Sequence, residues 1–320
     1  MKKRVVVLGG SGFFGNLIVE RLAKAGLQPI VASRTRGDLR IDANNAEDLR
    51  KNLKSRDLVV DCAGPFQKRN SALIETARTM GFDVIDISDS VEYASMIYKY
   101  EAPIGAAGIR VLTACSSLST ISAAVLKSLS VDEPRRLSAY LVPALRHTAS
   151  PSTIESVMAS LHGSFKRFHF PKPIGTRIGV SVKTVDSITL PRIFPTLKTT
   201  ELTVDLRFPG MNLALAAVPR WQFARRMMEK FQSKAIAIAK TLGTTHGVLG
   251  YEIASKAGFK YRIFTGDKSY MLAVLPAILA ATSIAEGRFT RRGLVPPTDH
   301  VEPSQLLEAV RNEGITFIAW

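Results

Sequence analysis

Short apolar strands alternate with helix-length segments from Arg4 to Leu129. This rhythm is typical of a parallel sheet covered by crossover helices. It predicts a Rossmann-type, doubly wound α/β domain over residues 1–130. The expected strands are Arg4–Leu8, Gln28–Ser33, Asp38–Ile41, Leu58–Cys62, Val84–Ile87 and Arg110–Thr113, and the expected helices are Phe14–Ala25, Ala46–Leu53, Asn70–Met80, Tyr93–Ala107 and Ser119–Leu129.

The pattern changes after Asp132-Glu133-Pro134, where longer strands are joined by turns. In the segment Leu202–Phe208 every second residue is apolar, which predicts a half-buried antiparallel strand. We therefore expect a second α+β domain over 131–285, built on a largely antiparallel sheet and serving substrate binding or dimerisation. We expect about 286–320 to rejoin the first domain, and the protein to be a homodimer. Companion strands are expected at Leu137–Val142, Val180–Leu190 and Phe259–Phe264, with a helix opening near Ser152 or Thr153.

A helix with two chemically different faces is predicted from about Arg220 to Leu242. Apolar side chains recur on one face at helical spacing, and charged ones lie opposite. Such a helix could rest on a membrane surface or on a partner subunit, but we expect it to pack on its own sheet. The apolar face is Trp221, Ala224, Met228 and Phe231, with Phe223 and Met227 at its edge, and the opposite face is Arg225, Arg226, Glu229 and Lys230.

Three features bear on location. The longest uncharged stretch, Ser269–Ala285, has 17 residues, fewer than the roughly 20 mostly apolar residues of a membrane span, so it predicts a buried core helix. At the start, the apolar run Val5–Leu8 stops at Gly9, which is too early for an export signal. Cys62 and Cys115 lie far apart without a CxxC partner, as expected for a reduced, cytoplasmic protein.

The basic residues are concentrated in the middle of the chain. The net charge is +16, and residues 131–268 hold 21 Lys and Arg against 9 Asp and Glu. A nucleic-acid surface would combine a basic stripe with stacking aromatics or a reader motif, and neither is present. The surplus therefore indicates an anionic ligand or a solvated basic face.

A glycine-rich turn follows the first strand and opens a helix. Its residues, Gly10-Ser11-Gly12-Phe13-Phe14-Gly15, form the G-x-G-x-x-G pattern in the strand–turn–helix context that dinucleotide binding requires. The first glycine permits the tight turn, the second lets the backbone approach a pyrophosphate, and the third lets helix and strand pack closely. The helix N-terminus then offers N–H groups to the phosphates.

The end of the second strand predicts the choice of cofactor. An NAD site usually carries Asp or Glu there, whereas this chain has Ser33-Arg34-Thr35-Arg36. A guanidinium binds a 2′-phosphate that a carboxylate would repel, so the sequence favours NADP; the alternative is that both arginines lie on an exposed loop. We expect the cofactor to contact Gly9 and the turn Gly10–Gly15, then Ser33, Arg34, Thr35 and Asp42, and finally Ala63, Gly64, Pro65 and Phe66 after the fourth strand, at the carboxyl edge where ligands bind.

Four segments together resemble the NADP-binding domain of the saccharopine dehydrogenase family. The most distinctive of them is Ala63-Gly64-Pro65-Phe66, and the segment Gly293-Leu294-Val295-Pro296-Pro297 with Glu313-Gly314-Ile315 is similar to the family's chain ending. The four segments are Gly9–Gly15, Ala32–Thr35, Cys62–Gln67 and Asp83–Asp89.

The resemblance implies an NADP-linked oxidoreductase with a sheet domain inserted before the chain returns to the Rossmann domain. Members of the family act on amino-acid imines, polyamine precursors and lipid enoyl groups, so the resemblance implies the cofactor more closely than the substrate. Two departures concern the substrate side. Val84 stands where members often carry an aromatic residue, and Cys115-Ser116-Ser117 where they carry glycine.

Hydride transfer usually needs a proton donor or acceptor beside the reacting carbon. His147 is the first candidate because it ends an expected strand and precedes a polar turn that opens a helix; the alternative is that it is a loop histidine without a catalytic role. Asp89 lies beyond the fifth strand at the ligand edge, or caps the next helix. Cys115 could approach the nicotinamide, or fill space as a small apolar residue. No metal-ligand spacing or G-x-S-x-G turn is present.

Three hypotheses follow. The first is an NADP-dependent oxidoreductase that acts on a small, anionic substrate of the imine, amino-acid or enoyl type. The second is a non-catalytic NADP(H)-binding sensor or regulatory protein. The third is a membrane-associated lipid-modifying reductase, suggested by the Trp221–Leu242 helix and the basic middle of the chain.

Overall fold

A computed structural model describes residues 3–128, 133–172, 174–207 and 210–320. The chain divides into two compact units. Unit 1 is Met1–Ala124 with Leu272–Leu306, and unit 2 is Val125–Met271 with Leu307–Trp320. The boundary predicted between residues 130 and 131 lies outside the described residues. Each unit is described by itself below.

Unit 1 contains a seven-stranded sheet in which every pairing is parallel. The order is β13-β6-β5-β4-β1-β2-β3, so the chain runs outward from β1 in both directions, and the switch point lies between β1 and β4. This confirms the predicted Rossmann-type, doubly wound fold. The strands are β1 (Val5–Leu8), β2 (Ile30–Ser33), β3 (Leu39–Arg40), β4 (Leu58–Asp61), β5 (Asp83–Asp86), β6 (Arg110–Leu112) and β13 (Gly293–Leu294).

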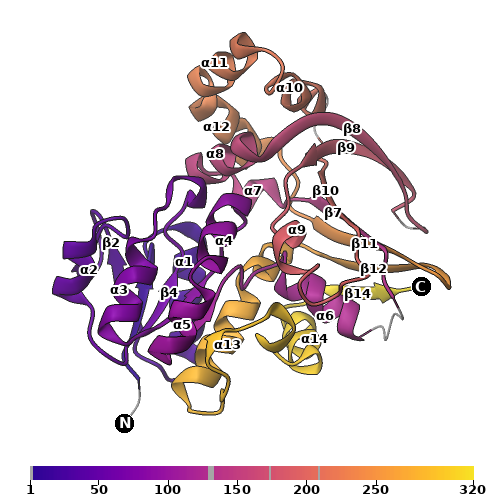
Figure 1. The fold of residues 1–320 in the computed structure, drawn as a ribbon. Helices are drawn as coiled ribbons and strands as arrows, with labels where there is room; N and C mark the ends of the chain where they lie inside the picture. Colours follow the sequence, from indigo (N-terminus) through magenta and orange to yellow (C-terminus); the bar gives the residue numbers. More distant parts are fainter. Residues whose placement is uncertain (1–2, 129–132, 173, 208–209) are drawn as a thin grey trace. The chain divides into compact units, whose positions relative to one another are not determined.

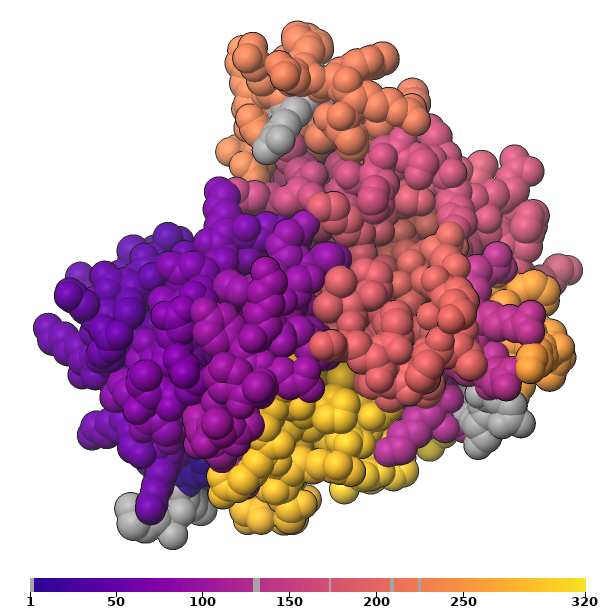
Figure 2. All heavy atoms as spheres, in the orientation of Figure 1, coloured from indigo at the N-terminus to yellow at the C-terminus, as the bar shows by residue number. Residues whose placement is uncertain are grey.

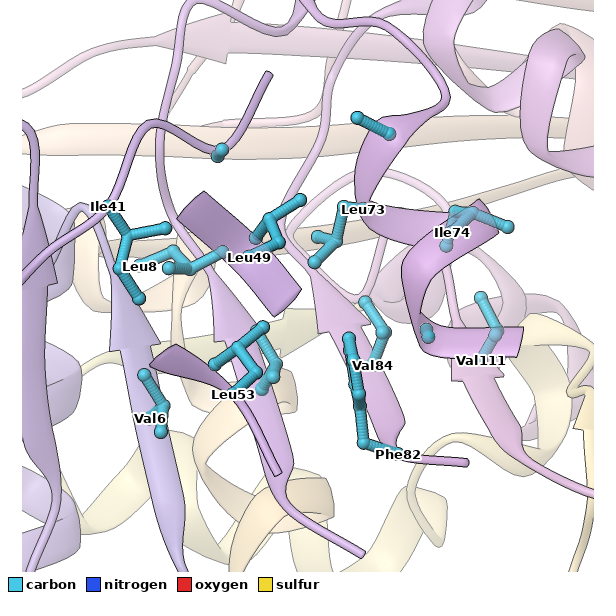
Figure 3. Packing of buried hydrophobic residues seen from close by; sticks show 14 of the residues in the cluster. Val6, Leu8, Ile41, Leu49, Leu53, Leu73, Ile74, Phe82, Val84 and Val111 are labelled. Carbon is cyan, nitrogen blue, oxygen red and sulfur yellow. The ribbon is translucent and has the colours of Figure 1, made fainter. Parts of the chain in front are cut away.

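Apolar strand and helix residues pack into the core of unit 1. Val6, Leu8 and Val84 from the strands meet Leu49 and Leu73 from the helices, and all five are buried (Figure 3). The segment predicted as one helix over Tyr93–Ala107 is two helices, because the backbone of Tyr100 (φ −94°, ψ 9°) leaves the helical conformation between them. The helical segments are α1 (Phe13–Lys24), α2 (Ala46–Asn52), η1 (Phe66–Lys68), α3 (Ala72–Met80), α4 (Val91–Tyr98), α5 (Glu101–Ala107), α13 (Leu275–Ala285) and η3 (Pro297–Asp299), and α6 (Thr120–Ser128) begins in unit 1 and ends in unit 2.

The stretch Ser269–Ala285 is a buried core segment, as predicted. A 3₁₀ turn, η2 (Ser269–Ala273), leads into α13, whose residues are mostly buried. Among the described residues, no helix is both long enough and apolar enough to cross a membrane.

Unit 2 is built on a mixed sheet in the order β14-β12-β11-β7-β10-β9-β8. All pairings are antiparallel except that of β7 with β10, which confirms the largely antiparallel sheet. Its elements are β7 (Arg136–Val142), α7 (Leu145–Thr148), α8 (Pro151–Ser160), β8 (Leu161–His169), β9 (Thr176–Val182), α9 (Asp186–Thr189), β10 (Thr199–Val204), α10 (Met211–Ala217), α11 (Gln222–Lys230), α12 (Gln232–Leu242), β11 (Gly247–Ser255), β12 (Gly258–Gly266) and β14 (Thr316–Ala319) (Figure 1).

The chain ending differs from the predicted return to the first domain. Helix α14 (Pro303–Asn312) leads into β14, which pairs antiparallel with β12 from Thr316↔Thr265 to Ala319↔Arg262. The last strand therefore completes the sheet of unit 2. Within 286–320, only the part up to Leu306 belongs to unit 1.

Three local predictions in unit 2 were wrong. The strand expected over Val180–Leu190 ends at Val182, because the Thr184 hydroxyl accepts the Asp186 N–H (3.3 Å) and α9 begins. The strand expected over Leu202–Phe208 ends at Val204, because the Asp205 carboxylate accepts the Arg207 N–H (2.9 Å) and Arg207 has φ +50°, which turns the chain; Phe208 lies outside the described residues. The helix expected over Arg220–Leu242 is interrupted at Phe231, and Trp221 and Phe231 of its apolar face are exposed.

Candidate nucleotide-binding site

The turn after β1 is held by its own backbone. Gly9 has φ +72°, in the left-handed region that favours glycine, and its N–H donates to Ala32 O (2.7 Å). The N–H of Gly12 donates back to Gly9 O (2.9 Å). A Cβ on Gly15 would lie 2.2 Å from Gly9 O. The third glycine of the motif is therefore required where the helix meets the turn.

Helix α1 begins at this turn without a side-chain cap. Gly12 is the N-cap residue and has no side chain to accept the first N–H groups. Ser11 and Gly12 are exposed. A pyrophosphate would satisfy these donors and would also gain from the helix dipole. The turn therefore fits the phosphates of a dinucleotide.

A second turn follows β2 and displays the predicted cofactor-selecting residues. The Ser33 hydroxyl accepts the Arg36 N–H (2.9 Å), which leaves Arg34 and Thr35 exposed between them. Within the described part of the chain the Arg34 guanidinium forms no ion pair. The nearest carboxylate in sequence, Asp38, accepts the Val31 N–H (2.9 Å). The turn therefore offers a cation where an NAD site would offer an acid.

Asp42, another predicted cofactor contact, lies in the loop between β3 and α2. Its carboxylate accepts the Asn44 N–H (2.9 Å), and its own N–H donates to Asp48 (3.0 Å). These bonds shape the loop. A role of Asp42 in binding the cofactor stays a prediction.

The Ala63–Phe66 loop lies directly against the glycine turn. A Cβ built on Gly9 would come within 2.7 Å of Cys62 O and 2.8 Å of Ala63 N. Gly64 is exposed, its bond to Pro65 is cis, and Phe66 is buried against the Tyr93 ring (5.3 Å between centroids). The structure thus brings together two of the segments that the sequence assigned to the cofactor.

A buried ion pair packs beneath the Ala63–Phe66 loop, on its protein side. Arg69 Nη1 lies 2.9 Å from Asp61 Oδ2, and both side chains are almost completely buried. The same nitrogen donates to Ala63 O (3.0 Å), and Nε donates to Asn44 Oδ1 (3.0 Å). Asp61 also accepts the Ala63 N–H (3.0 Å). Arg69 therefore connects the loop after β3, at Asn44, with the end of β4, at Asp61 and Ala63. This role was not identified from the sequence.

Asp86, at the end of β5, is a second buried acid that sequence reasoning passed over in favour of Asp89. Its Oδ1 accepts the N–H groups of Ser88 (3.0 Å) and Ala114 (2.9 Å), so it connects the ends of β5 and β6. Burial raises its pKa to about 6, although the hydrogen bond from Ala114 N–H acts against the shift. The sequence feature that could have identified Asp86 is its position as a carboxylate at the end of the apolar strand Asp83-Val84-Ile85-Asp86.

The predicted catalytic residues have different surroundings. Asp89 is exposed three residues beyond Asp86, and Ser90, rather than Asp89, caps α4 by accepting the Tyr93 N–H (3.2 Å). His147 lies on α7 of unit 2, exposed, with its ring 5.1 Å from that of Tyr270. The catalytic roles of both stay predictions. The capping alternative for Asp89 was wrong.

Cys115 is fully buried after β6. Its N–H donates to Asp86 O (2.7 Å), and burial raises the pKa of its thiol. A thiol in such surroundings is not a thiolate at neutral pH, so the residue packs as a small apolar group. In the described ranges no three His, Cys, Asp or Glu side chains gather as a metal site would require.

Several solved structures are similar to the chain at low sequence identity. A dehydrogenase from Chromobacterium violaceum is 11% identical, with TM-score 0.44, over 97% of this chain and 94% of that one. An oxidoreductase from Thermotoga maritima is 14% identical, with TM-score 0.43, over 99% and 98%. GenD2 from gentamicin A biosynthesis, in complex with NAD, is 12% identical, with TM-score 0.43, over 100% and 97%.

A search of the curated proteins gave no match. A family model, the saccharopine dehydrogenase NADP binding domain, matches residues 5–112. This range contains β1 to β6, the glycine turn, the Arg34 turn and the Ala63–Phe66 loop. The match identifies residues 5–112 as a nucleotide-binding Rossmann domain of the saccharopine dehydrogenase type and confirms the resemblance over that segment.

Proposed function

We propose that this protein is an NADP(H)-dependent oxidoreductase that transfers hydride between NADP(H) and a small, anionic substrate of the imine, amino-acid or enoyl type. The observation that carries the proposal is the exposed Arg34, without an ion pair in the described residues, on the turn after β2. It lies within the segment that matches an NADP-binding family model.

Each part of the cofactor has a fitting group in unit 1. The turn Gly9–Gly15 would hold the pyrophosphate through backbone N–H groups. The Arg34 guanidinium would pair with the 2′-phosphate, as a planar fork of donors suits phosphate oxygens. The Ala63–Phe66 loop at the carboxyl edge of β4 would limit the space beside the glycine turn. When bound, NADP(H) would supply or accept the hydride.

The charge of the second half of the chain supports an anionic substrate. Residues 131–268 carry 21 basic against 9 acidic side chains, a surplus that would attract a carboxylate or a phosphate. His147 and Asp89 are the candidates for proton transfer. Both are exposed, so a substrate could reach either one.

Titration of the protein with NADPH and with NADH, followed by nucleotide fluorescence, tests the cofactor assignment. We expect Arg34→Ala to weaken NADPH binding about tenfold or more, because a charge-assisted pair with phosphate contributes about 1.5–3 kcal/mol, and to leave NADH binding unchanged. Arg78→Ala removes another exposed arginine, in the last turn of α3, and serves as the control. Unchanged NADPH affinity in the Arg34 variant would refute the assignment.

Turnover is tested by the absorbance of NADPH against a panel of keto acids with amines and of enoyl thioesters. Oxidation of NADPH with at least one class supports the proposal and defines the substrate. Tight NADPH binding without turnover of any panel member would contradict catalysis and favour a non-catalytic sensor.

A further inference from the structure

Helices α11 and α12 of unit 2 carry large apolar side chains at the surface. Phe223 is 72% exposed, Trp221 66% and Leu242 68%. We call the six exposed apolar residues of this segment the helical patch: Trp221, Phe223, Met227, Phe231, Ile238 and Leu242. In the space-filling view this part of the chain, coloured orange, stands at the surface (Figure 2). Single exposed apolar residues are normal on a protein surface, but six of them in one short segment are not.

Five of the six patch residues follow helical spacing, and Trp221 precedes them as the N-cap residue of α11. Phe223, Met227 and Phe231 recur every fourth residue along α11, and Phe231 N–H donates to Met227 O (3.0 Å). Phe231, Ile238 and Leu242 continue the stripe on α12 at intervals of seven and four residues. Residues at these spacings share one helix face. The two helices therefore present apolar faces that meet at Phe231.

The described residues of unit 2 do not cover these faces. Helix α12 has no buried residue although it contains the apolar run Ala235–Ala239. Its link to α8 includes a polar bond, from Gln232 Nε2 to Pro151 O (3.1 Å). Exposed aromatic surface of this extent is unfavourable in water, which indicates a partner that removes it from water.

Basic residues are frequent along the segment that carries the patch. Residues 220–242 contain six Lys and Arg and a single acid, Glu229, a net charge of +5. The ammonium groups of Lys230 and Lys234 lie 5.8 Å and 5.7 Å from the centre of the Phe231 ring. Cationic groups therefore border the apolar face at Phe231, which differs from the core of a protein interface, where lysine is depleted.

This charge decides between two occupants. A symmetric dimer through the patch would place the same surface on both sides, and +5 would then face +5, an arrangement in which like charges repel. An anionic bilayer offers the complementary charge together with an apolar interior. Helices with Trp and Phe on one face and Lys and Arg on the other bind in the interfacial plane of such a bilayer.

We propose that the helical patch binds the surface of an anionic lipid bilayer. Trp221 and Phe223 enter the boundary between head groups and acyl chains, where aromatic rings are favoured. Arg226, Lys230 and Lys234 pair with lipid phosphates and carboxylates. The contact is peripheral. It would bring the NADP-binding protein to a membrane without inserting a span.

Flotation of the full chain with vesicles tests this proposal. We expect binding to vesicles that contain phosphatidylserine in phosphatidylcholine, weak binding to phosphatidylcholine alone, and loss of binding at high salt. Each basic residue near an anionic membrane strengthens binding about fivefold, so Lys230→Glu with Lys234→Glu should weaken it at least about 25-fold. Trp221→Ser with Phe223→Ser should also release the protein.

Matched controls separate a specific patch from general surface effects. Phe259→Ser removes another exposed aromatic ring, on β12, and Lys24→Glu with Lys99→Glu reverses two exposed lysines of unit 1; the Phe259 control should bind as the wild type does, and the lysine control nearly so. Unchanged thermal melting of the patch variants shows that they fold. Wild-type protein that does not float with anionic vesicles would overturn the proposal. So would patch variants that float normally, or a lipid-free dimer in sedimentation velocity that Trp221→Ser with Phe223→Ser dissociates.

Discussion

Arg69 Nη1 lies 2.9 Å from Asp61 Oδ2 beneath the Ala63–Phe66 loop, and neither side chain is open to solvent. Asp61 ends β4, while Arg69 follows η1, so the pair closes the loop between them. The guanidinium also lies 5.8 Å from the Phe66 ring centre and 5.9 Å from that of Tyr93. A charged pair thus fixes the loop that faces the glycine turn.

Arg69→Met should be strongly destabilising, because it leaves the Asp61 carboxylate buried without its cation. Breaking a buried ion pair in this way costs about 3–5 kcal/mol. Urea denaturation followed by circular dichroism measures the loss. Arg78→Ala, at an exposed helical position, should change the unfolding free energy by less than about 0.5 kcal/mol. Equal stability of the two variants would show that the pair does not hold the loop.

A methyl group at Gly15 should abolish nucleotide binding. The added Cβ would lie 2.2 Å from Gly9 O and 2.7 Å from Gly10 Cα, both backbone atoms, so the turn must open. Gly105→Ala is the matched control, since a Cβ there meets no atom within 4 Å. In the interior of α5 that change should stabilise the protein by about 0.5–1 kcal/mol. Isothermal titration with NADPH distinguishes the two, and normal affinity in Gly15→Ala would contradict the assignment of the turn.

Asp86 should make stability depend on pH. An unfolded aspartate titrates near 3.8, whereas burial raises the pKa of Asp86 to about 6. The native state therefore binds more protons between these values, and the free energy of unfolding falls as pH rises through this window. A shift of this size corresponds to about 3 kcal/mol.

Asp86→Asn cannot titrate and should lack this dependence. Measured by urea denaturation, the wild-type unfolding free energy minus that of the variant should decrease between pH 4 and 6. A difference that stays constant across the window would show that Asp86 ionises as in the unfolded chain.

His300 should act in the opposite direction. It is buried, with Nδ1 2.8 Å from the Thr120 hydroxyl and Nε2 3.0 Å from Val295 O. Burial lowers its pKa from 6.5 to about 4. Between these values the unfolded chain binds the extra proton, so its contribution is present above pH 6.5 and is lost as pH falls towards 4. His300→Gln should remove this loss of stability, which thermal melts between pH 6.5 and 4 measure. If the melting temperature of the variant falls with decreasing pH as steeply as that of the wild type, the prediction is contradicted.

The sequence predicted the parts of the site that lie close together along the chain. The Gly10–Gly15 motif and the Arg34 turn were readable because strand, turn and helix follow one another within a few residues. The Arg69–Asp61 pair was not predicted. The role of this pair depends on the additional bond from Arg69 to Asn44, 25 residues away. A pattern of apolar and polar residues along the chain does not predict a contact between side chains so far apart in sequence.

The same limit explains the errors in unit 2. The pairing of β14 with β12 joins residues about fifty positions apart, and the long β8 and β11 were not expected. Helical periodicity located the segment Trp221–Leu242, but periodicity gives the apolar face and not what covers it. Packing on its own sheet was the expected outcome for such a face, and the exposed Phe223 shows a different one.

The remaining catalytic prediction concerns His147. Its exposed ring packs at a tilt against that of Tyr270, with 5.1 Å between the ring centroids, so a substrate can reach it while the contact limits its rotation. If it donates or accepts the proton that accompanies hydride transfer, His147→Ala should lower kcat by about 100-fold or more and remove one limb of the pH–rate profile. NADPH affinity should stay unchanged. The control is His162→Ala, another exposed histidine, on β8. The measurement uses whichever substrate the panel identifies. A His147 variant with the kcat and pH profile of the His162 variant would remove His147 from the mechanism, and Asp89→Asn would then be the next variant to measure.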